Sequence, residues 1–279
     1  SGFASILVDD QTIDHFYNGE DISLDEEKEA CPNEFIMLVS NSNEKKSALS
    51  RYINPHVPLV KINEYKDGVW GVRARNKEQA FALDILMNPE IPIISLVGRA
   101  GCGKTLCAIA AGMEQCLGTK EYNKLIVSRP VQPMGKDIGF LPGTLEEKMM
   151  PWLAPIRDNL EFLMNGDNDT LDMYLERGLI EIEALTYIRG RSIANAFIII
   201  DEAQNLTSHE LKTIITRVGE GTKIVLTGDI EQIDNAYIDQ TSNGLTYAVE
   251  KFKSYDLSGH VTLKRGERSR VASLAAKIL

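Results

Sequence analysis

The chain has 279 residues, of which 43% are hydrophobic, enough for one sizeable core or for one core and a small satellite. The longest apolar runs, at 91–97 and 197–200, are far shorter than the ~20 residues of a membrane-spanning helix. The four cysteines form no CxxC pair and have no histidine at zinc spacing, so we expect a reduced, cytoplasmic protein without membrane contact.

The net charge of −10 argues against a protein that coats nucleic acid non-specifically. Its distribution is uneven. Residues 1–70 carry 13 acidic and 6 basic side chains, whereas residues 71–279 carry 27 and 24. Most of the acidity therefore lies in the N-terminal quarter, and a local basic surface beyond it is compatible with the composition.

Residues 1–70 predict a small β-containing extension or linker module. Short β-like runs occur at Ser5–Val8, Phe35–Ser40 and Leu59–Ile62, separated by an acidic stretch and by Asn, Ser and Pro turns. No motif in this part carries recognisable chemistry.

Strands and helices alternate over residues 71–279, which predicts an α/β domain with a mainly parallel sheet flanked by helices. The expected strands are Ile91–Val97, Lys124–Ser128, Leu179–Ala184, Ala196–Ile200 and Lys223–Leu226. The expected helices are Asn76–Met87, Lys104–Leu117, a helical region from Gly143 to about Glu176, and Ser208–Val218.

A phosphate-binding motif follows the first of these strands. The segment GRAGCGKT fits the pattern G-x-x-x-x-G-K-[ST], and a helix follows it at once. Its backbone N–H groups and the helix N-terminus are expected to cradle phosphates. The expected loop residues are Gly98, Arg99, Ala100, Gly101, Cys102 and Gly103. Lys104 would bridge the β- and γ-phosphates, and the Thr105 hydroxyl would ligate Mg²⁺.

An acidic pair, Asp201 and Glu202, ends the apolar strand at 196–200. A parallel strand delivers such residues to the carboxyl edge of the sheet, where ligands bind in these folds. We expect Asp201 to hold Mg²⁺ and Glu202 to be the general base that activates the attacking water.

Three further features refine the class of enzyme. In the sequence, the strand at 124–128 falls between the P-loop and the acidic strand, an arrangement typical of water-activating motor ATPases. No NKxD motif, which reads guanine in GTPases, occurs at a suitable place in the sequence, so ATP is favoured over GTP as the substrate. The segment Thr227-Gly228-Asp229 leads to Gln232, which we expect to sense the γ-phosphate while Asp229 orients it.

Several segments together resemble the PhoH family of ATPases over roughly residues 70–279. They are NKEQ at 76–79, GRAGCGKT, SRPVQPMGKDIGFLPGTLEEKMMPW, YIRGRSIANAFIIIDEAQN, LTGDIEQID and GERSRVASLAAKIL. The ending looks most like members in which a PIN ribonuclease domain precedes the PhoH domain. We therefore expect residues 1–70 to be a connecting region, and the chain to be the C-terminal part of such a protein.

The resemblance implies a RecA-like P-loop NTPase core, similar to superfamily-one helicases and acting on RNA. It implies that Gln79 reads the adenine edge and that Arg268 or Arg270 contacts the γ-phosphate, within the chain or across a subunit boundary. Superfamily-one motors normally need two RecA-like domains, and this chain has one, so a neighbouring subunit would have to supply the second. The resemblance therefore also implies a homo-oligomer, a ring such as a hexamer.

Single-stranded RNA or DNA is the partner that this resemblance favours, with RNA preferred. The candidate contacts lie in loops on the ATP side of the sheet: Arg129, Lys136, Phe140, Arg189 and Arg191. Each has an alternative. Phe140 could pack under its own loop, Arg129 could contact nucleotide, and Arg189 or Arg191 could pair with acidic neighbours.

Two other functions remain as alternatives to a nucleic-acid-coupled ATPase. One is a nucleotide-dependent assembly or switch module without translocation. The other is a small-molecule phosphotransferase, against which the acidic motif already counts.

Overall fold

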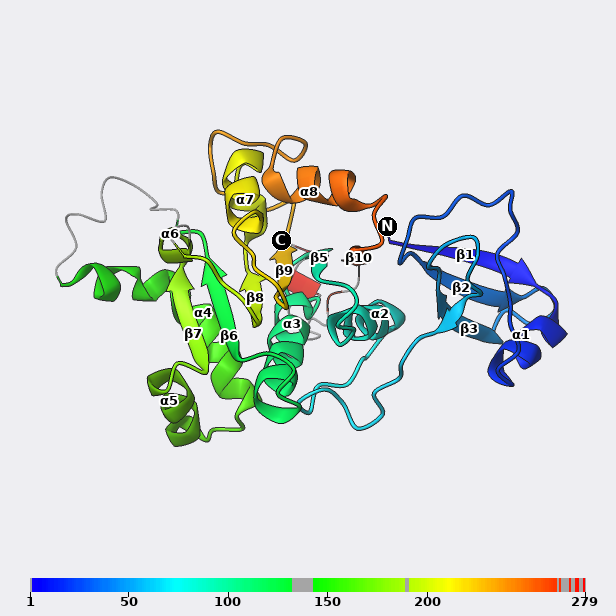
Figure 1. The fold of residues 1–279 in the computed structure, drawn as a ribbon, viewed down its shortest axis with the longest axis horizontal. Helices are drawn as coiled ribbons and strands as arrows, with labels where there is room; N and C mark the ends of the chain where they lie inside the picture. The colour runs from blue at the N-terminus through cyan, green and yellow to red at the C-terminus, as the bar shows by residue number, and fades with distance from the viewer. Residues whose placement is uncertain are drawn as a thin grey trace.

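The structure is a computed structural model that describes residues 2–131, 143–188, 191–264, 266, 271, 274–275 and 278. Its strands form two separate sheets, a four-stranded one near the N-terminus and a six-stranded one on which the later helices pack (Figure 1). Within these residues, no helix has both the length and the apolar character needed to cross a membrane.

The six-stranded sheet is parallel throughout, with the order β10-β5-β9-β8-β6-β7. Its strands are β5 (Ile93–Gly98), β6 (Lys124–Arg129), β7 (Ile180–Ala184), β8 (Ala196–Ile200), β9 (Lys223–Gly228) and β10 (Ser258–Leu263). This confirms the predicted α/β fold. In the sheet, β9 is the strand that separates the P-loop strand β5 from the acidic strand β8, while β6 lies beyond β8.

Helices cover both faces of this sheet, and a hydrophobic core lies under each (Figure 1). One face carries α2 (Lys77–Leu86), α3 (Lys104–Met113), α4 (Leu145–Leu163) and α5 (Asn168–Glu176). The other carries α6 (Leu185–Ile188), α7 (Ser208–Ile215) and α8 (Gly244–Phe252). Because apolar layers lie on both sides, β8 reads as an unbroken hydrophobic run and every residue in it is buried.

Several elements differ from the expectation. The single helical region at 143–176 is two helices, because Asn165 and Gly166 take left-handed backbone conformations between α4 and α5. The helices α8 and α1 (Asp10–Tyr17) and the edge strand β10 were not predicted. In β10 polar residues occupy half of the positions, so its sequence gives only a weak strand signal.

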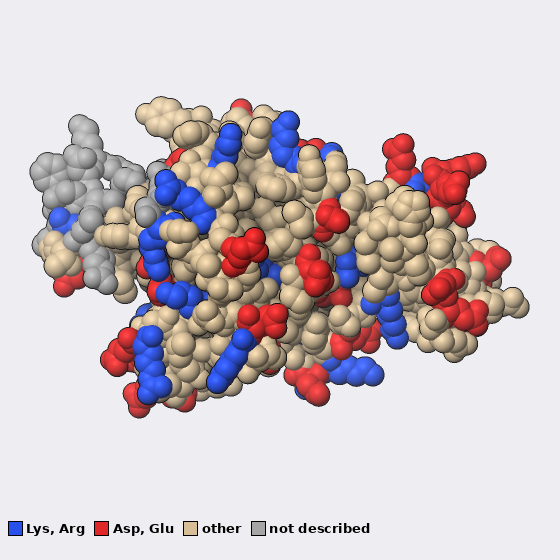
Figure 2. Space-filling view, in the orientation of Figure 1, with Lys and Arg blue, Asp and Glu red and all other residues tan. Residues whose placement is uncertain are grey.

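The N-terminal sheet has the order β1-β2-β3-β4, with β1 and β2 parallel and the other pairs antiparallel. Its strands are β1 (Phe3–Val8), β2 (Phe35–Ser40), β3 (Ser47–Arg51) and β4 (Val60–Lys61). The helix α1 packs on it over a core of its own, which includes Ile13, Phe16 and Leu38. Acidic side chains gather around this unit in Figure 2, in agreement with the excess of acidic residues at 1–70.

The N-terminal sheet docks on α2 and on the β10 edge. Phe35 of β2 stacks on Phe81 of α2, with ring centroids 4.3 Å apart. Arg51 of β3 forms an ion pair with Asp84 of α2 at 3.2 Å, and both side chains are buried. Asn33 donates a hydrogen bond to the carbonyl of Ser258, at the start of β10.

Breaking the ion pair between the two units is expected to destabilise the fold. Burial raises the pKa of Asp84, while Arg51 and the Asn63 N–H act against that rise. Asp84→Ala would leave Arg51 buried without its counter-charge, and should lower the free energy of unfolding by about 3–5 kcal/mol in urea titrations. The double variant Arg51→Met/Asp84→Leu removes both charges and should lose less than the single variant. A double variant at least as unstable as Asp84→Ala would contradict the charge argument.

Candidate nucleotide-binding site

The P-loop, the acidic pair and the segment after β9 meet at the carboxyl edge of the six-stranded sheet. They follow β5, β8 and β9, which are neighbours in the order β5-β9-β8, so the parallel register brings their ends together. Sequence motifs that lie more than a hundred residues apart therefore form one site.

The P-loop backbone depends on glycine at two positions. At Gly98 a Cβ would lie 2.6 Å from both the Cys102 Sγ and the Leu263 carbonyl oxygen, so no larger residue fits beside β10. Gly103 has φ = +86°, a left-handed conformation, and starts α3. The loop thus presents the N-terminus of α3 to a bound anion.

Lys104 is buried inside this loop, where its Nζ donates to the Arg99 carbonyl at 3.4 Å. Arg99 is itself held by Glu231 through two hydrogen bonds of 2.6 and 3.0 Å. The P-loop is therefore attached to the segment that follows β9, and an ammonium group lies within the phosphate cradle.

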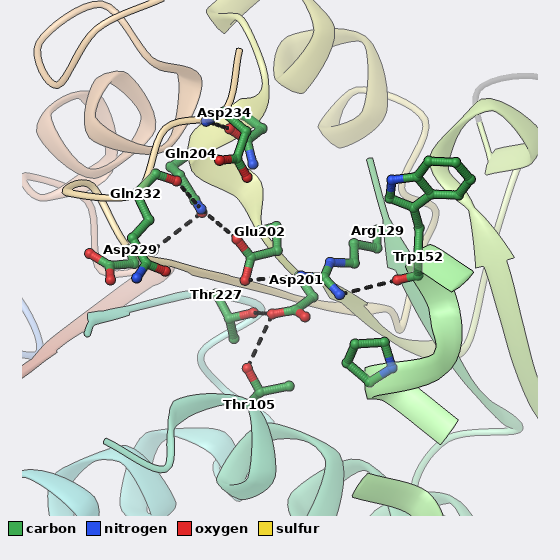
Figure 3. Close-up of polar contacts among 12 residues, drawn as sticks. Thr105, Arg129, Trp152, Asp201, Glu202, Gln204, Thr227, Asp229, Gln232 and Asp234 are labelled. Atoms are coloured by element: carbon green, nitrogen blue, oxygen red, sulfur yellow. Dashed lines mark hydrogen bonds and ion pairs between the residues drawn. The ribbon is translucent and has the colours of Figure 1, made fainter. Parts of the chain in front are cut away.

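The carboxylate of Asp201 joins two motifs. Its Oδ1 accepts a hydrogen bond from Thr105 Oγ1 at 3.1 Å and one from Thr227 Oγ1 at 2.7 Å (Figure 3). Asp201 is 5% exposed, and no lysine or arginine of the described chain forms an ion pair with it. A hydroxyl and a buried, uncompensated carboxylate are oxygen donors of the kind that Mg²⁺ takes in P-loop sites, so this pair fits that ion.

Glu202 adopts a left-handed backbone conformation, φ = +55°, directly after β8. Its carboxylate lies 3.5 Å from the Arg129 guanidinium at the end of β6. Burial and the charge of Asp201 raise the pKa of Glu202, while Gln204, Arg129 and Lys104 oppose the rise. A partly buried carboxylate with a raised pKa is suited to accept a proton near neutral pH.

Gln204 connects Glu202 to the segment after β9, and sequence reasoning missed it. Its Nε2 donates to the Glu202 Oε2 at 2.6 Å and to the Gln232 carbonyl at 3.0 Å, and its Oε1 accepts from the Asp229 N–H at 3.2 Å (Figure 3). The side chain is fully buried. Its place two residues after Glu202, in the sequence DEAQ, was the available signal.

The residues expected to sense the γ-phosphate lie beside this glutamine. Asp229 is buried and accepts a hydrogen bond from the Glu231 N–H. Gln232 is exposed, and its backbone, rather than its side chain, makes the contact with Gln204. The structure thus brings the backbone of Gln232 next to Gln204, and the role of Gln232 as a sensor remains a prediction.

Gln79 and Arg129 both lie at the pocket, with their polar atoms already engaged. Gln79 Nε2 donates to the Cys102 carbonyl at 3.1 Å, and its Oε1 accepts from the Arg75 N–H at 2.8 Å. Arg129 donates to the Trp152 carbonyl at 3.1 Å as well as facing Glu202 (Figure 3). Arg129 thus borders the pocket beside Glu202, and both roles considered for it stay predictions.

These groups border a pocket of about 840 Å³, large enough for a nucleoside triphosphate. The P-loop, Asp201, Glu202 and Arg129 form one end. The pocket continues between the strip Gly71–Arg75 and one side of α4.

The candidate nucleic-acid residues are only partly within the described chain. Arg191 pairs with Glu181 and Glu183 of β7 at 3.0 and 2.9 Å, which is the alternative considered for it. Lys136, Phe140 and Arg189 lie outside the described residues, as do Arg268 and Arg270. A surface formed by all five candidates stays a prediction.

Residues 71–279 match the model of a protein family described as PhoH-like protein. Protein PhoH2 of Bacillus subtilis strain 168 is 48% identical over 283 residues, which cover 100% of this chain and 64% of that protein. Protein PhoH2 of Thermobispora bispora is 37% identical over 280 residues, covering 100% of this chain and 62% of that protein. The chain thus spans less than two thirds of the length of these relatives.

Solved structures share only a distant likeness. The Pif1 helicase from Candida albicans is 16% identical, with a TM-score of 0.39 over 74% of this chain and 43% of that one. A likeness of this degree supports no argument about this chain.

Removing the amide of Gln204 is expected to raise the pKa of Glu202. Gln204→Met deletes the N–H donor that favours the ionised carboxylate and keeps a side chain of similar length. NMR titration of the glutamate side-chain carboxyl carbons, with Glu202→Gln to assign the signal, measures the effect. An unchanged titration midpoint in a folded variant would show that Gln204 does not set the charge state of Glu202.

Proposed function

This chain belongs to the PhoH family, and we propose that it binds ATP with Mg²⁺ and hydrolyses it at the site described above. The observation that carries the proposal is the junction at Asp201, which links Thr105 of the P-loop to Thr227 of β9 through hydrogen bonds of 3.1 and 2.7 Å. A P-loop alone binds phosphate. A P-loop joined to a buried acidic pair also has a place for the metal and a base for water.

In this proposal Gly98–Thr105 binds the triphosphate, Lys104 turns from the Arg99 carbonyl to the phosphates, and Thr105 and Asp201 hold Mg²⁺. The ion would neutralise charge on the β- and γ-phosphates. Glu202 accepts a proton from the attacking water while the water oxygen forms a bond to the γ-phosphorus. The bond between the γ-phosphorus and the β–γ bridging oxygen breaks, and ADP leaves. Gln232 senses the γ-phosphate, and Arg268 or Arg270 adds positive charge there.

Glu202→Gln is expected to lower kcat by about 10²-fold or more, because glutamine cannot accept the proton, while ATP binding persists. In the parent protein, kcat should fall as the pH drops through the pKa of Glu202, since protonation removes the base. Burial and Asp201 raise that pKa, so the loss begins at a higher pH than for an ordinary glutamate. Phosphate release across pH measures both effects.

Lys104→Ala serves as the matched control for that experiment. It should abolish ATP binding as well as turnover, whereas Glu202→Gln should affect turnover alone. Retention of parental kcat in Glu202→Gln would refute the assignment of the base. Retention of ATP binding and turnover in Lys104→Ala would refute the site itself.

The proposal extends to single-stranded RNA or DNA as the partner of hydrolysis, in a homo-oligomer. The support for this extension is the family resemblance. The contacts of Arg129 and Arg191, the two described candidates, add none, since both side chains are held within the chain. The alternative, a nucleotide-dependent assembly or switch module, uses the same ATP site and needs no nucleic-acid contact.

Single-stranded RNA is expected to increase the rate of ATP hydrolysis severalfold, with a smaller effect of DNA of the same sequence. Turnover with and without each strand, measured together with the mass of the particle in solution, tests this extension. Stimulation in a ring-sized particle supports a nucleic-acid motor. Unchanged turnover contradicts the extension, and nucleotide-dependent change in mass without stimulation favours the assembly module.

A further inference from the structure

The far end of the nucleotide pocket has a wall built by one side of α4. Pro155, Asn159 and Phe162 all border the pocket, and their spacing of four and three residues places them in one row along the helix. The row begins near Trp152, whose carbonyl binds Arg129 beside Glu202. From Pro155 to Phe162 it rises about 10 Å, away from the acidic pair.

Phe162 is an exposed aromatic residue at the end of this row. Its side chain is 67% exposed, although the large apolar residues around it, such as Leu160 and Leu163, are buried. No aromatic or cationic side chain of the described residues stacks on its ring. An unpartnered ring that borders a ligand pocket offers a face for a planar group.

A tight turn fixes the opposite wall against the same end of α4. Val69 and Val72 exchange two backbone hydrogen bonds, and Trp70 and Gly71 between them both have positive φ, as in a type I′ hairpin. The Trp70 indole N–H donates to the Leu163 carbonyl at 3.2 Å. The strip Gly71–Arg75 is thereby held close to the helix end that carries Phe162.

Gln79, the residue expected to read the adenine edge, is poorly placed for that role in this pocket. The hydrogen bonds of Gln79 tie it to the P-loop and to Arg75, and it is 5% exposed. Arg73 and Arg75 are exposed, and within the described chain neither guanidinium has an ion pair or a hydrogen bond. Guanidinium groups that have no partner in the chain can attract phosphate or contact a π face.

We propose that Phe162 is the platform on which the base of the bound nucleotide stacks, and that this stacking, rather than reading of the base edge, sets substrate choice. The site then accepts purine nucleoside triphosphates as a class, GTP as well as ATP. This inference rests on the proposed function, because it uses the same pocket. It assigns the base end to α4, opposite Arg73 and Arg75, and the triphosphate end to Lys104.

Equilibrium binding of ATP, GTP and inorganic tripolyphosphate to Phe162→Ala tests the inference. We expect ATP and GTP to bind about tenfold more weakly, which is the effect of losing one aromatic–base stack, and tripolyphosphate to bind as in the parent. Phe162→Tyr keeps the ring and should restore affinity, whereas Phe162→Leu keeps bulk without a π face and should not. Tyr255→Ala, another exposed aromatic substitution, is the control for surface effects.

The outcomes separate this inference from the proposed function. Parental ATP affinity in Phe162→Ala, or equal weakening of tripolyphosphate, overturns the stacking role while ATP hydrolysis stands. If the parent protein binds GTP at least a hundredfold more weakly than ATP, stacking is not the basis of substrate choice. An edge-reading group such as Gln79 would then set that choice. A parent protein that binds none of the three probes refutes the nucleotide site, and the inference with it.

Discussion

The hydrogen-bonded carboxylate of Asp201 is the constraint on which the site depends. It is buried at the end of β8, and it accepts hydrogen bonds from two neutral hydroxyls, those of Thr105 and Thr227. A buried carboxylate that lacks a counter-ion carries a large desolvation cost, which hydroxyl donors offset only in part. The same arrangement makes a cation at this point favourable, because it supplies the missing charge. The position of this carboxylate beside Thr105 therefore supports the proposed Mg²⁺ site.

The backbone next to this carboxylate is strained. A non-glycine residue in the left-handed region, such as Glu202, costs on the order of 1–3 kcal/mol and persists only where its surroundings hold it. Here β8 is fixed by the Asp201 N–H to the Ser128 carbonyl, and the side chain is held by Gln204 and Arg129. Asp201 and Glu202, although adjacent in the chain, have different partners: Asp201 contacts two threonine hydroxyls, and Glu202 contacts Gln204 and Arg129.

The sequence predicted the P-loop and the acidic pair because their chemistry requires particular residues at short, fixed spacing. The parallel sheet followed from buried apolar runs such as β8. The order of its strands did not follow, since periodicity says which residues are buried but not which strands are adjacent. Gln204 was missed for a related reason: its partners Asp229 and Gln232 lie 25 and 28 residues away, and only the fold brings them together. The pairing of Arg191 with β7 is equally a product of tertiary structure.

The helix α2 extends this network from the nucleotide site to the N-terminal sheet. At its first turn Gln79 donates to the Cys102 carbonyl of the P-loop, and near its C-terminal end Asp84 forms an ion pair with Arg51 of β3. The C-terminal end of α2 is held by Lys223, which is buried in β9. Its Nζ donates to the carbonyls of Ile85, Leu86 and Asn88, which satisfies all three N–H donors of the ammonium group. The ten-residue helix α2 thus contacts the P-loop at one end, and β9 and the N-terminal sheet near the other. These contacts connect the phosphate cradle to the N-terminal unit through a single short helix.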